Sequence, residues 1–251
     1  MSSRRRINLE LVALAAAAFA WLVSAQGFWE SLLRAIFPAQ PMVLMPRDTL
    51  AAFVAQHLAL VGVSSAVTIV IGIPLGIFVT RRRGAEFRSL VIAATDLGQT
   101  FPPIAVLALA MPVLGFGFWP TVMALSIYGL FPVVGSAIAG IEAVPRAVLD
   151  AAEGMGMSPS QRLLRVELPL AARVIVSGVR TSVAINIGTA TVGAAIGTGG
   201  LGVPIIGGLA VQNMAYVLEG AIPAAMLAVL ADAVLGQIEA AVTVADSAAT
   251  T

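Results

Sequence analysis

Two long stretches of the sequence contain no charged side chain, and this feature restricts the fold more than any other. Leu58–Val79 and Trp119–Ile141 each run without an acidic or basic group. The hydrocarbon core of a bilayer is about 30 Å thick, and a helix needs roughly 20 predominantly apolar residues to cross it. Each stretch is therefore predicted to be a membrane-spanning helix.

The whole chain has the composition of a membrane protein. It has 251 residues, of which 59% are hydrophobic and 11% are charged, and its mean hydropathy is +0.98. This length leaves room for about six spans and for no separate catalytic domain. Cysteine is absent, so disulfides, thiol nucleophiles and cysteine-based metal sites are excluded, and we expect no metal site. The predicted fold is an all-α polytopic membrane protein with spans at Ile7–Gln26, Gln56–Val79, Ser89–Leu114, Trp119–Ile141, Val174–Ile196 and Tyr216–Ile238.

The arginines gather on one side of these predicted spans. All 14 basic residues are arginine, and short cytoplasmic loops carry an excess of basic residues. A cytoplasmic N-terminus leaves only Arg34 and Arg47 on the periplasmic side. Arg180 would lie in the first turns of the fifth span, where it can snorkel to the interface. The arginines placed in the cytoplasm are Arg4, Arg5, Arg6, Arg81, Arg82, Arg83, Arg88, Arg146, Arg162, Arg165 and Arg173.

The first predicted span has two interpretations. Arg4–Arg6, the apolar run Leu9–Val23 and the small residue Ala25 are also typical of a secretory signal peptide. Cleavage would remove one span and leave the orientation of the others unchanged. We expect an uncleaved anchor, so that residues 1–48 form an N-terminal transmembrane anchor and a periplasmic segment, and residues 49–251 form the main transmembrane domain.

The longest arginine-bearing loop, residues 142–173, is predicted to contain two short helices separated by a glycine turn. Pro145 suits the first turn of the first helix, which runs to about Met155. Gly154 and Gly156 can end this helix with a residue at positive φ.

The second short helix has a clear start signal. Ser158 is predicted to be its N-cap, with Pro159 at the first helical position and Gln161 at the third, which is a capping-box pattern. We expect this helix to run to about Glu167.

Small residues form a smooth stripe on the first loop helix. Ala147, Ala151 and Gly154 recur at helical spacing, with Asp150 and Glu153 to the side. Such a stripe permits close docking of another protein. The alternative is a helical hairpin packed under its own bundle.

A longer pattern in this loop resembles a known family. Asp150-Ala151-Ala152, three residues, Gly156, nine residues, Val166 and then Leu168-Pro169 resemble the EAA loop of the permease subunits of ATP-binding-cassette importers. Asp150 stands where that family usually has glutamate, which keeps the charge on a shorter side chain. In that family the loop forms coupling helices that sit in a groove of a cytoplasmic ATPase. The resemblance implies a MetI-like type I importer fold with an ATPase-coupling site at Asp150, Ala151, Ala152, Glu153, Gly156, Met157, Ser158, Leu168 and Pro169.

Three further segments, Gly98–Pro103, Tyr128–Pro132 and Val179–Ala190, resemble the osmoprotectant branch of these permeases. This resemblance implies alternating-access import of glycine betaine, choline, carnitine or proline betaine, and the alternative is another small polar solute of the amino-acid type. It also implies a bacterial inner-membrane protein whose partners are cytoplasmic ATPase subunits, a second permease that is identical or paralogous, and membrane lipid, but no nucleic acid. Because the sequence ends at Thr251, we expect the periplasmic solute-binding protein to be a separate chain.

The chain itself is expected to hold no cofactor. No Walker A sequence is present, so ATP and Mg²⁺ are expected on the partner ATPase and this chain is not expected to be an enzyme.

Candidates for the translocation pathway are polar or aromatic residues in these segments. Asn186 lies at bilayer depth, where an amide must face protein or water, and the alternative for it is an interhelical hydrogen bond. Aromatic faces can attract a quaternary ammonium through cation–π interaction. The candidate residues are Gln99, Thr100, Phe101, Tyr128 and Asn186.

A glycine-rich segment precedes the last span. Gly197, Gly199 and Gly202 spell GxGxxG, but the dinucleotide fingerprint requires a preceding strand, and an apolar helix is predicted here instead. We interpret Gly197–Asn213 as a re-entrant or surface loop where a binding protein docks, or as plain turns.

Two rival classes are a secondary transporter that works without ATP and a membrane enzyme. Ion-coupled carriers usually place acids within the membrane. Here only Asp96 and Asp232 qualify, and we expect both to lie near interfaces or helix contacts. No histidine cluster, cysteine or serine dyad supplies a catalytic constellation, and the lone histidine, His57, is interpreted as a polar anchor near an interface.

Overall fold

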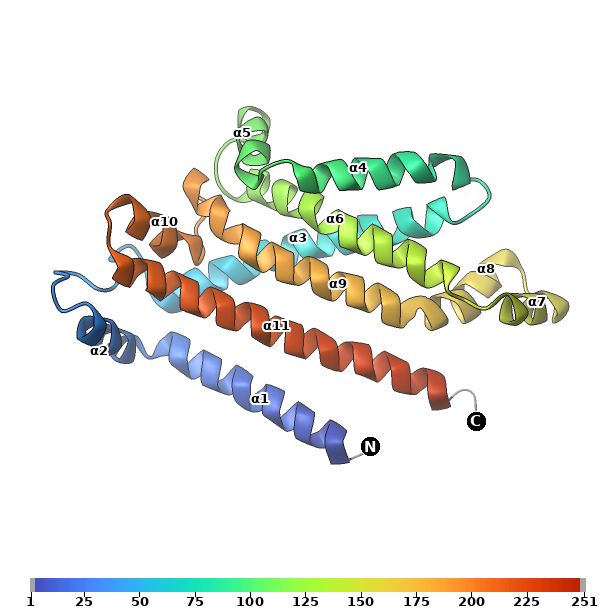
Figure 1. Cartoon of the computed structure of the whole chain (residues 1–251), viewed down its shortest axis with the longest axis horizontal. Helices are drawn as coiled ribbons and strands as arrows, with labels where there is room; N and C mark the ends of the chain where they lie inside the picture. Colours follow the sequence, from blue (N-terminus) through green and yellow to red (C-terminus); the bar gives the residue numbers. More distant parts are fainter. Residues whose placement is uncertain (1–2, 249–251) are drawn as a thin grey trace.

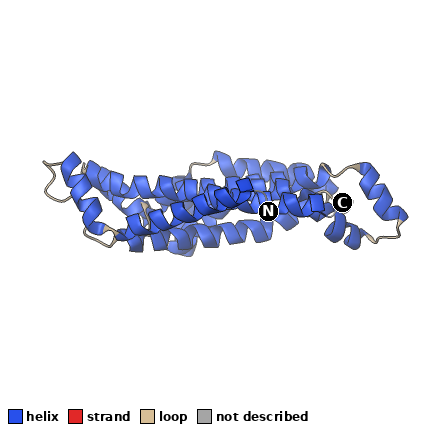
Figure 2. Cartoon of the chain, turned by 90° about the horizontal axis from the view of Figure 1, so that it is seen from below, coloured by secondary structure: helices blue, strands red, loops and turns tan. Residues whose placement is uncertain are grey.

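The structure is a computed structural model that describes the backbone of residues 3–248 and the side chains of residues 9–241. The side chains of Arg4, Arg5 and Arg6, which enter the topology argument, lie outside the described residues. Within the described range every regular element is helical and no strand occurs (Figure 2). The helices are α1 (Ser3–Ser24), α2 (Gln26–Ile36), α3 (Leu50–Val79), α4 (Arg88–Thr100), α5 (Pro103–Leu114), α6 (Phe118–Glu142), α7 (Arg146–Gly154), α8 (Pro159–Arg162), α9 (Leu168–Ala190), α10 (Gly202–Ala210) and α11 (Met214–Ala248). The shorter elements are the 3₁₀ turns η1 (Ala85–Phe87) and η3 (Thr191–Ile196) and the π turn η2 (Leu163–Glu167).

By length and composition, the described helices provide between 4 and 6 membrane spans. The count is 6 if each of two bent helix pairs makes one span. The predicted all-α polytopic fold is therefore confirmed. The long spans are Leu50–Val79, Phe118–Glu142, Pro159–Ile196 and Met214–Ala241, and the bent pairs are Leu9–Ser24 with Gln26–Ile36 and Ala85–Thr100 with Pro103–Leu114.

The prediction of one continuous helix over Ser89–Leu114 is wrong. The segment is broken between α4 and α5, whose directions differ by 100° (Figure 1). Phe101 has an extended ψ of 135° because it precedes Pro102, and a residue before proline is disfavoured in the α region. Pro102 also lacks the N–H that a continuous helix needs.

Helices α3, α6 and α9 pack closely to form the centre of the bundle (Figure 1). Small residues allow this close approach. A Cβ on Gly76 of α3 would lie 2.6 Å from the Ala137 Cβ of α6, and a Cβ on Gly129 of α6 would lie 2.6 Å from the Ser182 Oγ of α9. A larger residue at either position would force the helices apart.

The other helices surround this centre. α11 packs beside α9, α1 packs beside α11, and α4 packs on α6 (Figure 1). The short helices α7 and α8 extend from one end of the bundle, while α2 and α10 lie at the opposite end. The loop between α6 and α9 is thus set apart from the segment between α9 and α11.

The segment Gly197–Asn213 is largely helical, which corrects its interpretation as a loop. α10 occupies most of it, and Gly202 is the first residue of that helix. Gly197, Gly199 and Gly200 have positive φ angles and form a turn, which agrees with the plain-turn alternative for these glycines. The Gly200 N–H donates to the Gln56 Oε1 of α3 at 2.8 Å and holds the turn against the bundle.

The segment that follows α2 is hydrogen-bonded to polar side chains of α11 and of the turn before α11. The Asn213 Nδ2 donates to the Met42 carbonyl at 2.8 Å, and the buried Glu219 accepts from the Met45 N–H at 2.7 Å. This non-helical segment is therefore packed against the same end of the bundle as α10. Whether a binding protein docks there stays a prediction.

Candidate functional site

The first helix of the loop between α6 and α9 forms as predicted. Pro145 is the N-cap of α7, and the helix ends at Gly154. Gly156 has a φ of +77°, a conformation in which a side chain would be strained whatever the space around it. The predicted glycine turn is therefore confirmed, with Gly156 as the positive-φ residue.

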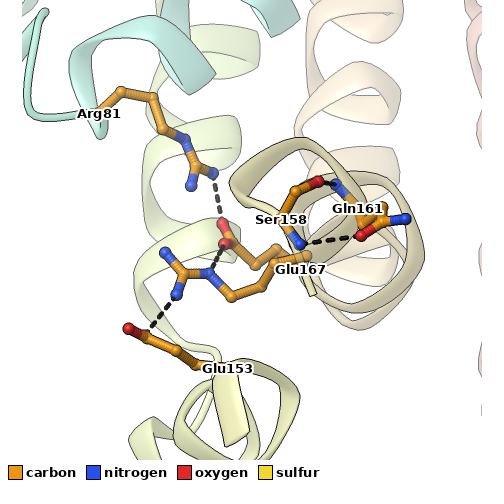
Figure 3. Close-up of polar contacts among 6 residues, drawn as sticks. Arg81, Glu153, Ser158, Gln161 and Glu167 are labelled. Carbon is orange, nitrogen blue, oxygen red and sulfur yellow. Dashed lines mark hydrogen bonds and ion pairs between the residues drawn. The ribbon is translucent and has the colours of Figure 1, made fainter. Parts of the chain in front are cut away.

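The predicted capping box is also confirmed. Ser158 Oγ accepts from the Gln161 N–H at 3.3 Å, and Gln161 Oε1 accepts from the Ser158 N–H at 2.9 Å (Figure 3). These two bonds satisfy backbone donors at the start of α8 and set its direction.

The end predicted for the second loop helix is wrong. α8 does not stop at Glu167 but passes through the π turn η2 directly into α9. Pro159–Ile196 is consequently one helical segment of 38 residues, and the fifth span does not begin at Val174. Pro169 lies inside this segment, directly after the π turn η2. Membrane helices tolerate proline where a local π adjustment satisfies the freed backbone groups.

α7 presents two different faces. Ala152 is buried against the bundle, whereas the stripe of Ala147, Ala151 and Gly154 is exposed, as is Asp150. Met155 adds an apolar side chain that is 70% exposed next to the stripe. The stripe is therefore free to contact another protein, whereas Ala152 packs α7 against the bundle.

A chain of charged side chains connects α7 to the bundle. The Glu153 carboxylate of α7 accepts from the Arg162 Nη1 at 3.0 Å, and the Arg162 Nε donates to Glu167 Oε1 at 3.3 Å. The other Glu167 oxygen accepts from Arg81, which follows α3 (Figure 3). We call Glu153, Arg162, Glu167 and Arg81 the Glu167 relay.

Glu167 is the buried member of this relay, with 2% of its surface exposed. A buried carboxylate is tolerated when charged partners compensate its lost hydration, and removing a partner is then costly. A cavity of about 440 Å³ lies beside the relay, with Arg146 and Glu142 in its wall.

The Glu167 relay was missed by sequence reasoning. Arg162 and Glu167 are five residues apart, and α-helical neighbours are three or four apart. The π turn η2 brings them together because its hydrogen bonds join residues five apart. The partner Arg81 is 86 residues away from Glu167, so no local pattern indicates it.

The candidate pathway residues do not converge on one place. Gln99 Nε2 donates to the Tyr128 carbonyl at 3.0 Å and joins α4 to α6. Thr100 and Phe101 are exposed at the break between α4 and α5. Asn186 is fully buried, and its Nδ2 donates to the Ser64 Oγ of α3 at 3.3 Å. This bond matches the interhelical alternative for Asn186, and a pathway role for the five residues stays a prediction.

Two polar residues differ from their predicted roles. His57 is fully buried and does not anchor an interface; its Nε2 lies 3.0 Å from the Ile187 carbonyl. That carbonyl is available because α9 tightens into η3, where the Thr191 N–H donates to the Gly188 carbonyl instead.

Arg180 does not snorkel but forms ion pairs with Asp232 and Glu239 of α11. Asp232 thus lies at a helix contact, as expected.

An all-helical chain with these spans and an exposed helix–turn–helix loop between two central spans has the architecture of an importer permease. The family model described as "Binding-protein-dependent transport system inner membrane component" matches residues 72–244, and the chain belongs to this family of multi-pass inner-membrane permeases.

Curated relatives and solved structures agree with this assignment. The chain is 42% identical over 173 residues to the glycine betaine/carnitine/choline transport system permease protein OpuCD of Bacillus subtilis, covering 68% of this chain and 75% of that protein. It is 39% identical over 180 residues to the osmoprotectant import permease protein OsmY of Salmonella typhimurium, covering 72% of this chain and 76% of that protein. An inward-facing structure of the MetNI methionine ABC transporter matches with a TM-score of 0.70 at 23% identity, over 77% of this chain and 95% of that one. The predicted MetI-like permease fold is confirmed.

Proposed function

We propose that this chain is the membrane-spanning permease subunit of an ATP-driven importer of osmoprotectants such as glycine betaine or choline. The named relatives support the solute class. The exposed face of α7, with its smooth stripe and the neighbouring Asp150, is the single observation that carries the ATP-driven part of the proposal.

Each part of the loop has a mechanical role in this proposal. A cytoplasmic ATPase docks on the stripe of Ala147, Ala151 and Gly154, where small side chains let its surface approach the α7 backbone. The glycine turn at Gly156 and the Ser158 capping box hold α7 and α8 in one shape. Met157, Leu168 and Pro169 belong to the same coupling segment as the link to α9.

Movement of α7 then reaches the bundle by two routes. One route is the continuous helix from α8 through η2 into α9. The other is the Glu167 relay, which ties α7 and α8 to Arg81 at the end of α3. Closure of the ATPase therefore moves α3 and α9 together, and this rigid-body shift reverses the side on which the pathway opens.

The proposal also includes the partners and the orientation. Two ATPase subunits bind ATP and Mg²⁺ and carry out hydrolysis, a separate periplasmic protein delivers the solute, and a second permease completes the membrane unit. The N-terminus and the end of the bundle that carries α7 are cytoplasmic, in agreement with the arginines at that end. The end that carries α10 faces the periplasm.

Affinity purification from membranes that contain the natural partners tests this proposal. We expect a stoichiometric ATPase, and a solute-binding protein that binds glycine betaine or choline. Ala151→Arg places a long charged side chain on the stripe and is expected to abolish ATPase capture. Ala85→Arg makes the same change at an exposed position of the loop between α3 and α4 and is the matched control. Equal capture by both variants, or solute uptake with no ATPase present, would overturn the assignment.

A further inference from the structure

Helix α2 has an apolar side that the rest of the described chain leaves exposed. Phe28, Leu32 and Ile36 are four residues apart and therefore share one side of the helix. They are 45%, 37% and 54% exposed, and we call them the apolar row. Trp29 and Leu33 form the neighbouring row, and both are buried in the core of the bundle. The apolar row is therefore separate from the side chains that pack α2 against the bundle.

The side of α2 away from the apolar row is polar. Glu30 and Arg34 are four residues apart and form an ion pair, with 3.0 Å between Glu30 Oε1 and Arg34 Nη2. Both side chains are 53% exposed, and Ser31 beside them is exposed too. Successive residues are about 100° apart around a helix, so the ion pair lies about 160° from the apolar row. A helix with one charged side and one apolar side is typical of a segment that lies in the plane of a membrane interface.

The direction of α2 fits such an orientation. α2 turns by 75° from the direction of α1, so it runs nearly parallel to the membrane surface where α1 crosses the membrane. A side chain of α2 itself holds this corner, because the Trp29 Nε1 donates to the Leu22 carbonyl in the last turn of α1 at 2.9 Å. The bend is therefore built into the packing of the two helices.

The apolar row continues the exposed apolar surface of α1. The ring of Phe28 contacts the ring of Trp21 of α1, with 5.9 Å between their centroids. Trp21 is exposed, and so are Leu11 and Leu14 further along α1. A helix with apolar side chains on its outer side suits contact with lipid tails when it crosses a membrane. This continuity makes lipid the partner of the apolar row.

The tryptophans mark the level of the membrane boundary. The chain has three of them, and Trp21 and Trp29 lie on the two sides of the α1–α2 corner. Trp119, which is exposed, is the second residue of α6. Because the other end of α6 leads to α7, Trp119 lies toward the end of the bundle that carries α2 (Figure 1). Tryptophan is enriched where lipid headgroups meet hydrocarbon, so this boundary passes close to α2.

We propose that α2 is an interfacial helix whose apolar row inserts among the lipids at the membrane surface. The row reaches about 5–10 Å into the boundary between headgroups and acyl chains, while Glu30 and Arg34 face water. α1 alone is then the first span, and α2 does not cross the membrane. The lipids are those of the periplasmic leaflet in the orientation proposed above, but the depth of α2 depends neither on that orientation nor on ATP or the solute.

Spin labels on single cysteines measure this depth, because the chain has no cysteine of its own. Leu32→Cys and Ile36→Cys report on the apolar row. Ser31→Cys is the matched control, since Ser31 is exposed on the polar side of the same helix. Val70→Cys, at an exposed position within α3, is the reference for a deep contact with lipid. The full chain, with the proteins that co-purify with it, is reconstituted into vesicles of phosphatidylethanolamine and phosphatidylglycerol.

Collisions of each label with oxygen, which concentrates in lipid, are compared with collisions with a water-soluble nickel chelate. We expect the labels at Leu32 and Ile36 to meet the chelate at least about fivefold less often than the label at Ser31, and to lie shallower than the label at Val70. Equal access of the chelate to the three labels on α2 would overturn the proposal and place the apolar row in water. A depth equal to that of Val70 would mean that α2 crosses the membrane with α1. Low access of both reagents would indicate a dry contact with another protein, and either of these two results also rejects the interfacial helix.

Discussion

Glu167 and Arg81 form an ion pair that joins the start of α9 to the end of α3, although 86 residues separate them in the sequence. Arg162 binds the other oxygen of Glu167 and also Glu153 of α7. Ion pairs therefore connect the exposed helix α7 to two of the three central helices. In the function proposed above, this arrangement makes the electrostatics of a buried carboxylate part of the coupling between an ATPase and the membrane bundle.

Removing the charge of Glu167 is expected to weaken this coupling. Glu167→Gln keeps the size of the side chain, but it leaves Arg81 without its anionic partner and Arg162 with Glu153 alone. We expect a cost of about 1–3 kcal/mol in stability. We expect the number of solute molecules imported per ATP hydrolysed to fall more than the amount of folded protein. Reconstituted vesicles give this ratio directly.

Arg88→Gln is the control for Glu167→Gln. It breaks an ion pair with Glu142 that also joins two helices near the same end of the bundle but does not involve α7. This variant is expected to keep the wild-type ratio. The same ratio for wild type, Glu167→Gln and Arg88→Gln would mean that the Glu167 relay is only structural.

Gly156→Val is expected to impair docking of the ATPase. Gly156 has a φ of +77°, and a β-branched residue in that conformation strains the backbone by about 1–3 kcal/mol. The turn between α7 and α8 should distort while membrane insertion stays normal. Gly62→Val, at an exposed α3 glycine where an added Cβ would have open space around it, serves as the control. Wild-type transport and solute-stimulated ATPase activity in Gly156→Val would contradict a rigid coupling shape.

Asn186→Leu is expected to act mainly on stability. The side chain is fully buried and bonds to Ser64 and Ser65 of α3, and such interhelical bonds in membranes contribute about 0.6–2 kcal/mol. Thermal unfolding in detergent should therefore shift to lower temperature, while transport per folded molecule stays near wild type. A selective loss of transport with unchanged thermal stability would restore Asn186 to the pathway.

Local features of this chain were predictable from sequence, and contacts between distant segments were not. The Ser158 capping box and the Gly156 turn depend on residues within one helical turn, and both formed as expected. The start of the fifth span was misplaced because Arg162, Arg165 and Glu167 interrupt the apolar pattern. Those charges are satisfied largely by partners that only the fold brings near.

Two further errors have different causes. The break between α4 and α5 carried a visible signal in Phe101-Pro102, but the apolar run on both sides favoured one span. The burial of His57 was not predictable because its partner is the backbone carbonyl of Ile187, on another helix.

The orientation of the bundle can be tested independently of function. Because Arg81 contacts Glu167, the α3–α4 loop and α8 must lie on the same side of the membrane. Reporter fusions after Arg83 and after Glu167 should both read cytoplasmic, and a fusion after Gln40 should read periplasmic. A periplasmic signal after Glu167 would place the α7 stripe out of reach of any ATPase.

The most direct test of the central claim is uptake of radiolabelled glycine betaine into vesicles that contain this chain, its ATPase and enclosed ATP, with the binding protein outside. We predict accumulation against a gradient that requires hydrolysable ATP and is lost with a non-hydrolysable analogue. Accumulation driven by an ion gradient in the absence of ATP would contradict the claim and place the chain among secondary transporters.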